Sequence, residues 1–394
     1  MGAAQEPAGG PMLRLGLSQQ FEAASNPALS ADPDPMARAV SALDLALSSE
    51  TRRERLSLGF GAELRAETEG GAEFAAPALR LDYGRVGAGA ALDAAARLSA
   101  REIAYLAPLP DLGASGLPPE IADIEDLRGT GTRVAGDVSA RLRLGEGGPL
   151  GGHLGLRASA IEYRDASAPE LRDSERLAFE AGLRLAPGGR GEIGLDLGLA
   201  GVEQAGGPRR ETASLELSLE RAARRGAVGG AARIERAEGG ERYALSARRR
   251  VELPRGTLDG RLGLSRDTGG DWGLSGRVDL RREIGAAALS LGAERAVITT
   301  AEGERWRSAL RLGWERPLGE AMRIGFDLSA QHSAAADGEA RRAVQAAARL
   351  SRTLTRDWSL DLTARAAGRD APGEAAARDY GLSLGLSRAL TLPF

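Results

Sequence analysis

Only two histidines and no cysteine are present, so few side chains of this chain could support catalysis or bind a metal. His332 lies in a polar stretch, with Asp337 and Glu339 shortly after it. A hydrolase would need a second acid or a nucleophile within hydrogen-bonding distance of that imidazole, and the spacing specifies neither. His153 is isolated, and we expect a solvated side chain there. We therefore predict that the chain is not an enzyme and holds no metal or other cofactor, and a hydrolase site near His332 ranks third among the alternatives.

A group of carboxylates lies in the long polar segment 105–130. Apolar residues at helical spacing follow Pro118-Pro119 and predict a short helix. The other side of that helix carries Asp123, Glu125 and Asp126. These carboxylates would narrow any channel into which the segment folded, whereas an ordinary surface loop is the alternative interpretation.

Charged side chains elsewhere recur at every second position of apolar stretches. In residues 132–144, valine, alanine and leucine alternate with Arg133, Asp137, Arg141 and Arg143. Because successive side chains of a strand point to opposite faces, this period of two predicts strands with one apolar and one charged face. An arginine at the centre of a bilayer costs about 2–4 kcal/mol, so the charged face is expected to point into an aqueous interior. The candidate inward, pore-lining residues are Arg141, Arg184, Asp196, Arg261, Arg277, Asp279, Arg311, Asp327, Arg349 and Asp361.

The unit of strand, tight turn, strand and longer loop repeats from about residue 12 to the C-terminus. Counting units gives about 20 strands, in a range of about 18–22, each near the length of a tilted membrane strand. We therefore predict an all-β fold, a single closed antiparallel transmembrane β-barrel over 11–394, with a short periplasmic tail at 1–10 and a long external loop at 105–130. A flat soluble sheet is the alternative, but no second apolar layer is available to cover it, and closure removes the exposed edges.

Aromatic residues fall near the ends of the predicted strands, where two girdles are expected at the membrane interfaces. Connections also alternate between short ones, such as 145–149, and longer ones, such as 165–174 and 331–341. Rings that cap a soluble core are the alternative interpretation. The residues predicted at the external rim are Phe21, Tyr163, Tyr243, Trp272, Trp306 and Tyr380, and those at the periplasmic rim are Trp314 and Trp358.

Composition excludes several other classes of protein. No run of about 18 apolar residues is present, so a helical membrane span is excluded. The formal net charge of -3 offers no basic patch for nucleic acid. Met1 leads into Gly-Ala-Ala-Gln-Glu-Pro without a basic and apolar leader, and we interpret the chain as a mature form whose signal peptide has been removed.

The two ends of the chain carry a resemblance to a known group. From Tyr380 to the terminal Phe394, large apolar side chains share one face, with Arg388 as an interruption and Pro393 next to the end. This pattern resembles the closing strand of Gram-negative outer-membrane β-barrels, which the barrel-assembly machinery reads. The first strand followed by Asn26-Pro27 is similar to a family of β-barrel porins, some of them associated with exopolysaccharide export. The resemblance implies the cell outer membrane as location, lipid and lipopolysaccharide as surroundings, and no catalytic residues.

General porins are similar in a further respect, because their constriction loop follows the fifth strand and sets acidic residues against an arginine-lined wall. That resemblance implies the same role for Asp123, Glu125 and Asp126. We expect a channel for passive diffusion of small polar solutes or for export of a polysaccharide. A loop-plugged structural or adhesin barrel without transport is the main alternative. The sequence leaves the solute and the oligomeric state open.

Overall fold

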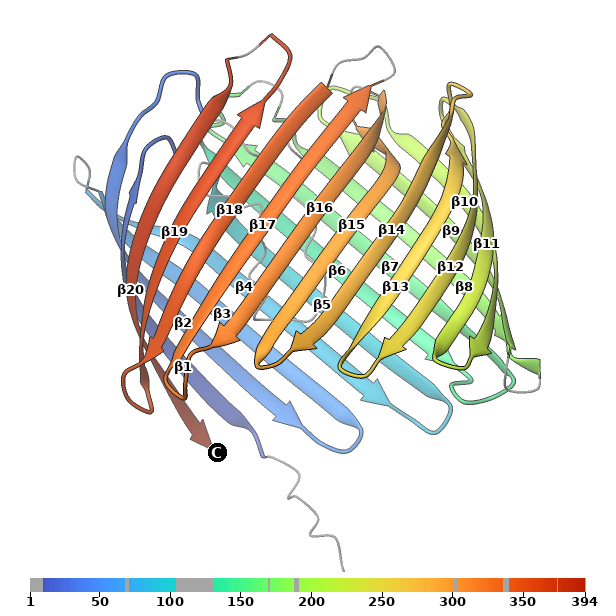
Figure 1. Cartoon of the computed structure of the whole chain (residues 1–394), viewed down its shortest axis with the longest axis horizontal. Coiled ribbons are helices and arrows are strands. Elements are labelled where there is room, and N and C mark those ends of the chain that lie inside the picture. Colours follow the sequence, from blue (N-terminus) through green and yellow to red (C-terminus); the bar gives the residue numbers. More distant parts are fainter. Residues whose placement is uncertain are drawn as a thin grey trace, which may run out of the picture.

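Side chains point alternately to the two faces of each strand, and the tilted strands form a closed barrel (Figure 1). The computed structural model describes residues 10–67, 71–103, 130–168, 171–187, 191–300, 303–335, 340–373 and 375–393. No helix in these ranges is long and apolar enough to cross a membrane. The strands are β1 (Met12–Ala24), β2 (Met36–Glu50), β3 (Glu54–Glu67), β4 (Ala72–Val86), β5 (Ala90–Glu102), β6 (Thr132–Leu144), β7 (Leu150–Arg164), β8 (Ser174–Leu185), β9 (Gly191–Gln204), β10 (Arg210–Ala223), β11 (Gly226–Ala237), β12 (Gly240–Leu253), β13 (Gly256–Arg266), β14 (Trp272–Ile284), β15 (Ala287–Thr300), β16 (Gly303–Pro317), β17 (Met322–Ala335), β18 (Ala340–Thr353), β19 (Trp358–Asp370) and β20 (Ala377–Pro393).

Each strand pairs antiparallel with the next along the chain, and the last returns to the first. The register of β1 with β20 runs from Met12 opposite Pro393 to Ala24 opposite Gly381. The described strands therefore form one 20-stranded sheet that closes on itself. This confirms the predicted all-β fold, the antiparallel closure and the strand count. Closure matters because an open edge would leave backbone donors and acceptors without partners in lipid.

Connections differ between the two ends of the barrel, which we call the short-turn end and the long-loop end. Both terminal strands begin or end at the short-turn end (Figure 1). Gly145 starts one of its turns with a φ of 66°, and a Cβ there would lie 2.4 Å from the Leu150 carbonyl oxygen. The difference in connection length between the two ends is smaller than predicted. Strands β17 and β18 extend into the expected loop 331–341 and leave only 336–339 between them.

The longest connection joins β5 to β6, as predicted, but most of it lies outside the described residues. The predicted helix and its carboxylates Asp123, Glu125 and Asp126 fall in that part, so they stay predictions. The same holds for the N-terminal tail and for the role of Phe394.

Contacts across several strands identify which face is inward. Arg261 on β13 reaches Glu216 on β10 at 3.4 Å, and Arg248 on β12 reaches Glu220 on β10 at 3.4 Å. Side chains converge on the concave face of a curved sheet and diverge on the convex face, so these residues point into the barrel. The opposite face carries the large apolar side chains, and Leu262, for example, is 61% exposed. An apolar exterior around a charged interior reverses the order of a soluble protein, and it places the barrel across a membrane.

A bulge in β4 shifts the alternation once. The register of β3 with β4 is interrupted between Gly61 and Glu63, and Ala76 has a φ of 49°. Pro77 follows, a residue that sheets tolerate mainly at bulges because it lacks an N–H. Phe74 and Leu79, on either side of the bulge, both point outward even though one is even-numbered and the other odd-numbered.

Tryptophans cover outward arginines in the apolar belt. The Arg388 guanidinium lies 5.5 Å from the Trp358 ring centroid, and that of Arg295 lies 5.3 Å from the Trp306 ring centroid. A ring face stabilises the cation and shields it from lipid. Arg388, which interrupts the apolar row of β20, is therefore accommodated on the outer surface. The prediction for Tyr163 is wrong in one respect, because it lies opposite Arg133 on the inward face rather than in an outer girdle.

Polar contacts at the long-loop end stabilise the seam, which is the pairing of the first strand, β1, with the last strand, β20. Oδ1 of Asp379 accepts hydrogen bonds from the backbone N–H of Asn26 at 2.8 Å and from the Ser25 hydroxyl at 3.3 Å. The Asn26 side chain bonds in both directions with the backbone of Ser30, at 2.9 and 3.1 Å. Asn26 and Asp379 are only 2% and 3% exposed. A polar group left without a partner in such a place is costly.

We predict that Asp379→Ala destabilises the folded barrel by about 1–3 kcal/mol, because the Asn26 N–H and the Ser25 hydroxyl lose their acceptor. Urea unfolding in micelles, followed by tryptophan fluorescence, measures the change. Asp34→Ala, at an exposed position of the loop between β1 and β2, is the matched control and is expected to unfold like the unaltered chain. Equal stabilities for both variants would show that these contacts contribute nothing to the seam.

Candidate functional site

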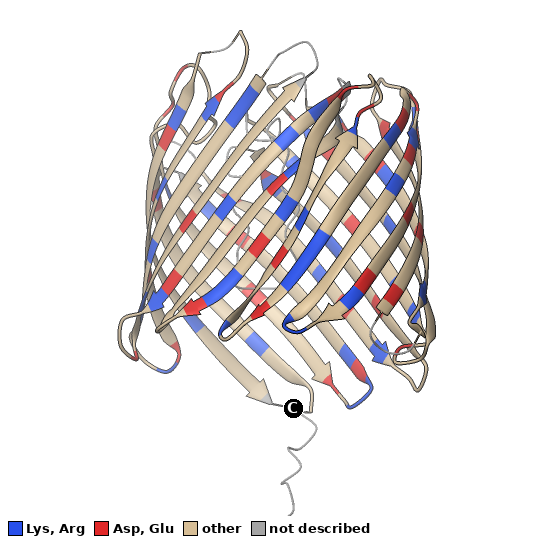
Figure 2. Cartoon of the chain, turned by 45° about the vertical axis from the view of Figure 1, so that its right-hand side comes forward, with Lys and Arg blue, Asp and Glu red and all other residues tan. Residues whose placement is uncertain are grey.

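Charged residues occur along the middle of the strands and not only at the rims (Figure 2). The ten candidate inward residues that fall in described strands all lie on the inward face, from Arg141 opposite Asp93 to Asp361 opposite Gly385. The alternation in the sequence was sufficient to find them. Their part in permeation stays a prediction. The ten are Arg141, Arg184, Asp196, Arg261, Arg277, Asp279, Arg311, Asp327, Arg349 and Asp361.

An arginine row crosses the inner wall on three consecutive strands. Arg248, Arg261 and Arg277 are direct cross-strand neighbours on β12, β13 and β14. Like charges placed opposite each other destabilise a sheet unless they are balanced. Carboxylates supply the balance, since Arg248 contacts Asp259 at 2.7 Å and Arg277 contacts Asp279 at 2.6 Å. The row therefore holds its guanidinium groups in fixed positions at the wall.

A second arginine-rich area, here called the arginine sector, covers the inward face of β16–β19. Along these four strands the inward arginines outnumber the inward carboxylates Glu315, Asp327 and Asp361. The sector is positively charged at neutral pH because arginine stays protonated. Its arginines are Arg305, Arg307, Arg311, Arg323, Arg341, Arg349, Arg365 and Arg369.

Carboxylates dominate another part of the wall, nearly half the circumference away on β9 and β10. Asp196 lies opposite Glu216, and Glu192 lies opposite Glu220. We call these four residues the carboxylate sector. His153 on β7 points inward, and its Nε2 lies 3.6 Å from Oδ1 of Asp196. Arginines of neighbouring strands contact this sector, since Glu192 lies 3.5 Å from Arg184, and Glu216 and Glu220 each lie 3.4 Å from an arginine of the arginine row.

His332, the candidate for a hydrolase site, lies on the outward face of β17. Its cross-strand neighbours are Ser308 and Arg342. The Ser308 hydroxyl accepts a hydrogen bond from Nη1 of Arg295 at 3.5 Å, and no hydrogen bond joins His332 to a serine or carboxylate of the described residues. Asp337 and Glu339 lie outside the described part. Within that part, no cluster of His, Asp and Glu could hold a metal ion.

Comparison with known proteins gives a shared fold at low sequence identity. No protein-family model matches the chain, and no curated protein matches it. The chain is similar to the siderophore receptor PirA from Pseudomonas aeruginosa, with 10% identity, a TM-score of 0.52, and coverage of 98% of this chain and 81% of that one. Lower TM-scores of 0.46 and 0.44 relate it to OccK5 (OpdH) and to OccK2 (OpdF) in complex with glucuronate, both from P. aeruginosa. These two are 11% and 12% identical, and each match covers 97% of this chain and 98% of the other.

We predict that removing charge from the arginine row makes the lumen more cation-selective. In the double variant Arg248→Gln and Arg277→Gln, Asp259 and Asp279 lose their nearest cations, so their negative potential extends into the lumen. The zero-current potential of bilayers in a salt gradient measures the change, which should shrink at high ionic strength.

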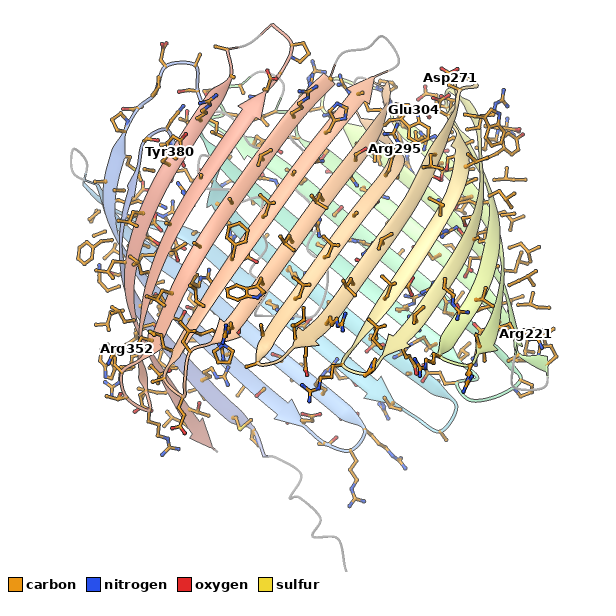
Figure 3. All side chains as sticks on the ribbon, viewed as in Figure 1. Arg221, Asp271, Arg295, Glu304, Arg352 and Tyr380 are labelled. Atoms are coloured by element: carbon orange, nitrogen blue, oxygen red, sulfur yellow. The ribbon has the colours of Figure 1, made fainter. Side chains whose placement is uncertain are left out.

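The control is Arg221→Gln with Arg352→Gln, which removes two outward arginines near the short-turn end (Figure 3). This control should leave the zero-current potential unchanged. An equal shift in both double variants would mean that the inward position of the row does not matter.

Proposed function

We propose that this protein is an outer-membrane channel through which small polar solutes diffuse passively. The observation that carries the proposal is the charged inner face of a closed 20-stranded barrel whose outer face is apolar. A ring of that size is too wide for its own side chains to fill. Charges along the whole inner wall also need water, because burial without solvent or partners is costly. An aqueous lumen satisfies both conditions.

The arginine sector supports a finer proposal about selectivity. Its arginines outnumber its carboxylates, whereas the carboxylate sector and the arginine row are balanced by contacts between opposite charges. The excess of arginine gives this part of the wall a positive potential. We therefore expect small organic anions to pass more readily than cations of equal size.

The long connection between β5 and β6 bears on whether the lumen is open. In our proposal, Asp123, Glu125 and Asp126 narrow the lumen opposite inward arginines. A plugged barrel that serves as an adhesin or an envelope anchor is the alternative, and it would conduct neither ions nor solutes. A polysaccharide remains a second candidate cargo, since a wide aqueous lumen also fits an extended hydrated chain.

Liposome swelling tests the channel proposal directly. We predict that vesicles containing the folded chain swell in solutions of small sugars and sugar acids. Rates should fall as solute size rises, because passage is diffusive, and a sugar acid should enter faster than an amino sugar of equal size. Vesicles with heat-unfolded chain are the control. An inserted, folded barrel that gave no swelling would contradict the proposal and favour the plugged alternative.

Deleting residues 111–127 tests the constriction separately. We predict a larger single-channel conductance, because the narrowest part of the lumen widens, and a weaker selectivity, because the local charges are lost. The triple variant Asp123→Asn, Glu125→Gln and Asp126→Asn is the matched control for charge at unchanged length. It should alter selectivity while leaving conductance near its original value. Unchanged conductance and selectivity in the deletion variant would show that this segment does not line the lumen.

A further inference from the structure

A shallow apolar groove of about 1030 Å³ runs over the outer surface from β11 to β18. Its floor is formed by outward-pointing residues with small side chains. Leu262, Leu274 and Leu310 also line it and point outward with the rest of the apolar belt. Small and large residues alternate across the strands, because Val278 lies between Gly260 and Ala293, and Leu310 lies between Ala293 and Ala330. The floor is therefore a row of depressions between larger side chains. Its small residues are Ala247, Gly260, Gly276, Ala293 and Ala330.

The groove crosses the pairing of β14 with β15, which has one of the two shortest registers of the described wall. The register of β14 with β15 begins at Gly276 opposite Arg295, although β14 itself begins at Trp272. Above that point the Trp306 ring occupies the space beside β14, and a Cβ on Gly273 would lie 2.5 Å from it. The neighbouring seam, β15 with β16, continues to Thr300 opposite Gly303. The Trp306 side chain, rather than strand pairing, therefore fills this seam toward the long-loop end.

Basic residues border the upper part of the groove. Arg295, His332 and Arg342 all line it and all belong to outward positions. Figure 3 places Arg295 near the long-loop end, just below Glu304. Two carboxylates lie nearby: Asp370 is the cross-strand neighbour of Arg342, and Glu304 contacts Arg242 at 2.6 Å. Arginine at a lipid-facing position is costly unless an anion or an aromatic ring compensates it.

We propose that this groove binds a phosphorylated, acylated glycolipid of the outer leaflet. An acyl chain lies along the small-residue floor, and phosphate groups bind Arg295 and Arg342. The guanidinium of Arg295 stacks on Trp306 and still presents its N–H edge, which is the geometry that arginine uses for phosphate. The leaflet follows from the orientation predicted from the sequence, in which the long loop 105–130 is external. The binding itself does not depend on which solute the lumen carries.

A second copy of this chain fits the groove less well. Symmetric pairing through the same surface would bring Arg295 and Arg342 of both copies together, and like charges in a low-dielectric contact repel. Two recessed surfaces would also leave a gap between them. An anionic lipid complements both the charge and the shape of the groove.

Lipid binding to the full folded chain in a neutral detergent provides the test, with purified lipid A as the probe and native mass spectrometry as the readout. Two double variants remove the two halves of the site. Arg295→Gln with Arg342→Gln removes the cations, and Ala293→Leu with Ala330→Leu fills the floor. We expect each to weaken lipid A binding about tenfold, the change that corresponds to the loss of about 1.4 kcal/mol.

Two matched controls change the same residue types elsewhere on the outer surface. Arg221→Gln with Arg352→Gln removes outward arginines near the short-turn end, and Ala140→Leu with Ala158→Leu enlarges outward alanines of β6 and β7. Both controls should bind like the unaltered chain. Heat-modified migration on gels confirms folding of every variant, and liposome swelling should be equal in all of them.

Three outcomes would overturn the proposal. Groove variants that bind lipid A like the controls would show that the lipid lies elsewhere. Phosphatidylglycerol that competes as well as lipid A would assign the site to a phospholipid instead. A loss of oligomers in the alanine-to-leucine groove variant, with lipid binding unchanged, would assign the groove to a contact between copies.

Discussion

Closure of the sheet through the pairing of β1 with β20 is the constraint on which the rest of the structure depends. In lipid, every backbone N–H and C=O needs a partner inside the protein, and only a ring of strands supplies partners on both sides of each strand. An antiparallel ring of this type needs an even number of strands, so the start of β1 and the end of β20 lie at the same end of the barrel, the short-turn end. The buried contacts of Asp379 with Ser25 and Asn26 lie at that seam, where the chain must meet itself after its full length.

Closure also determines which partners the charged side chains can reach. On the concave face, arginine side chains reach carboxylates two or three strands away, as Arg261 does with Glu216. The wall is therefore cross-linked by ion pairs that remain in contact with water, and each contributes modestly to stability. Their larger effect is on the potential inside the lumen, because the carboxylate sector is paired with neighbouring arginines, whereas arginine exceeds carboxylate in the arginine sector. On the convex face, Arg295 and Arg388 instead lie against tryptophan rings.

Local features of the fold could be predicted from the sequence because they depend on neighbouring residues. The period of two assigns Arg141, Asp196 and Arg349 to the inward face without knowledge of their partners. Long-range features could not be predicted, since they depend on the register around the ring. The Arg261–Glu216 contact and the shortened pairing of β14 with β15 are of this kind. The bulge at Ala76 and the inward turn of Tyr163 also escaped prediction, because each departs from simple alternation or from the usual place of an aromatic ring.

The central claim is that alternate residues of each strand face water inside the barrel and lipid outside it. Because the chain contains no cysteine, single cysteines can be introduced along β19 at positions 360, 361, 362 and 363 without background. A membrane-impermeant thiol reagent, applied to vesicles that contain the folded chain, measures the access of water to each position. The account predicts rapid labelling at 361 and 363 and protection at 360 and 362. Equal labelling at all four positions, or protection of all four, would contradict an aqueous lumen inside a membrane-embedded barrel.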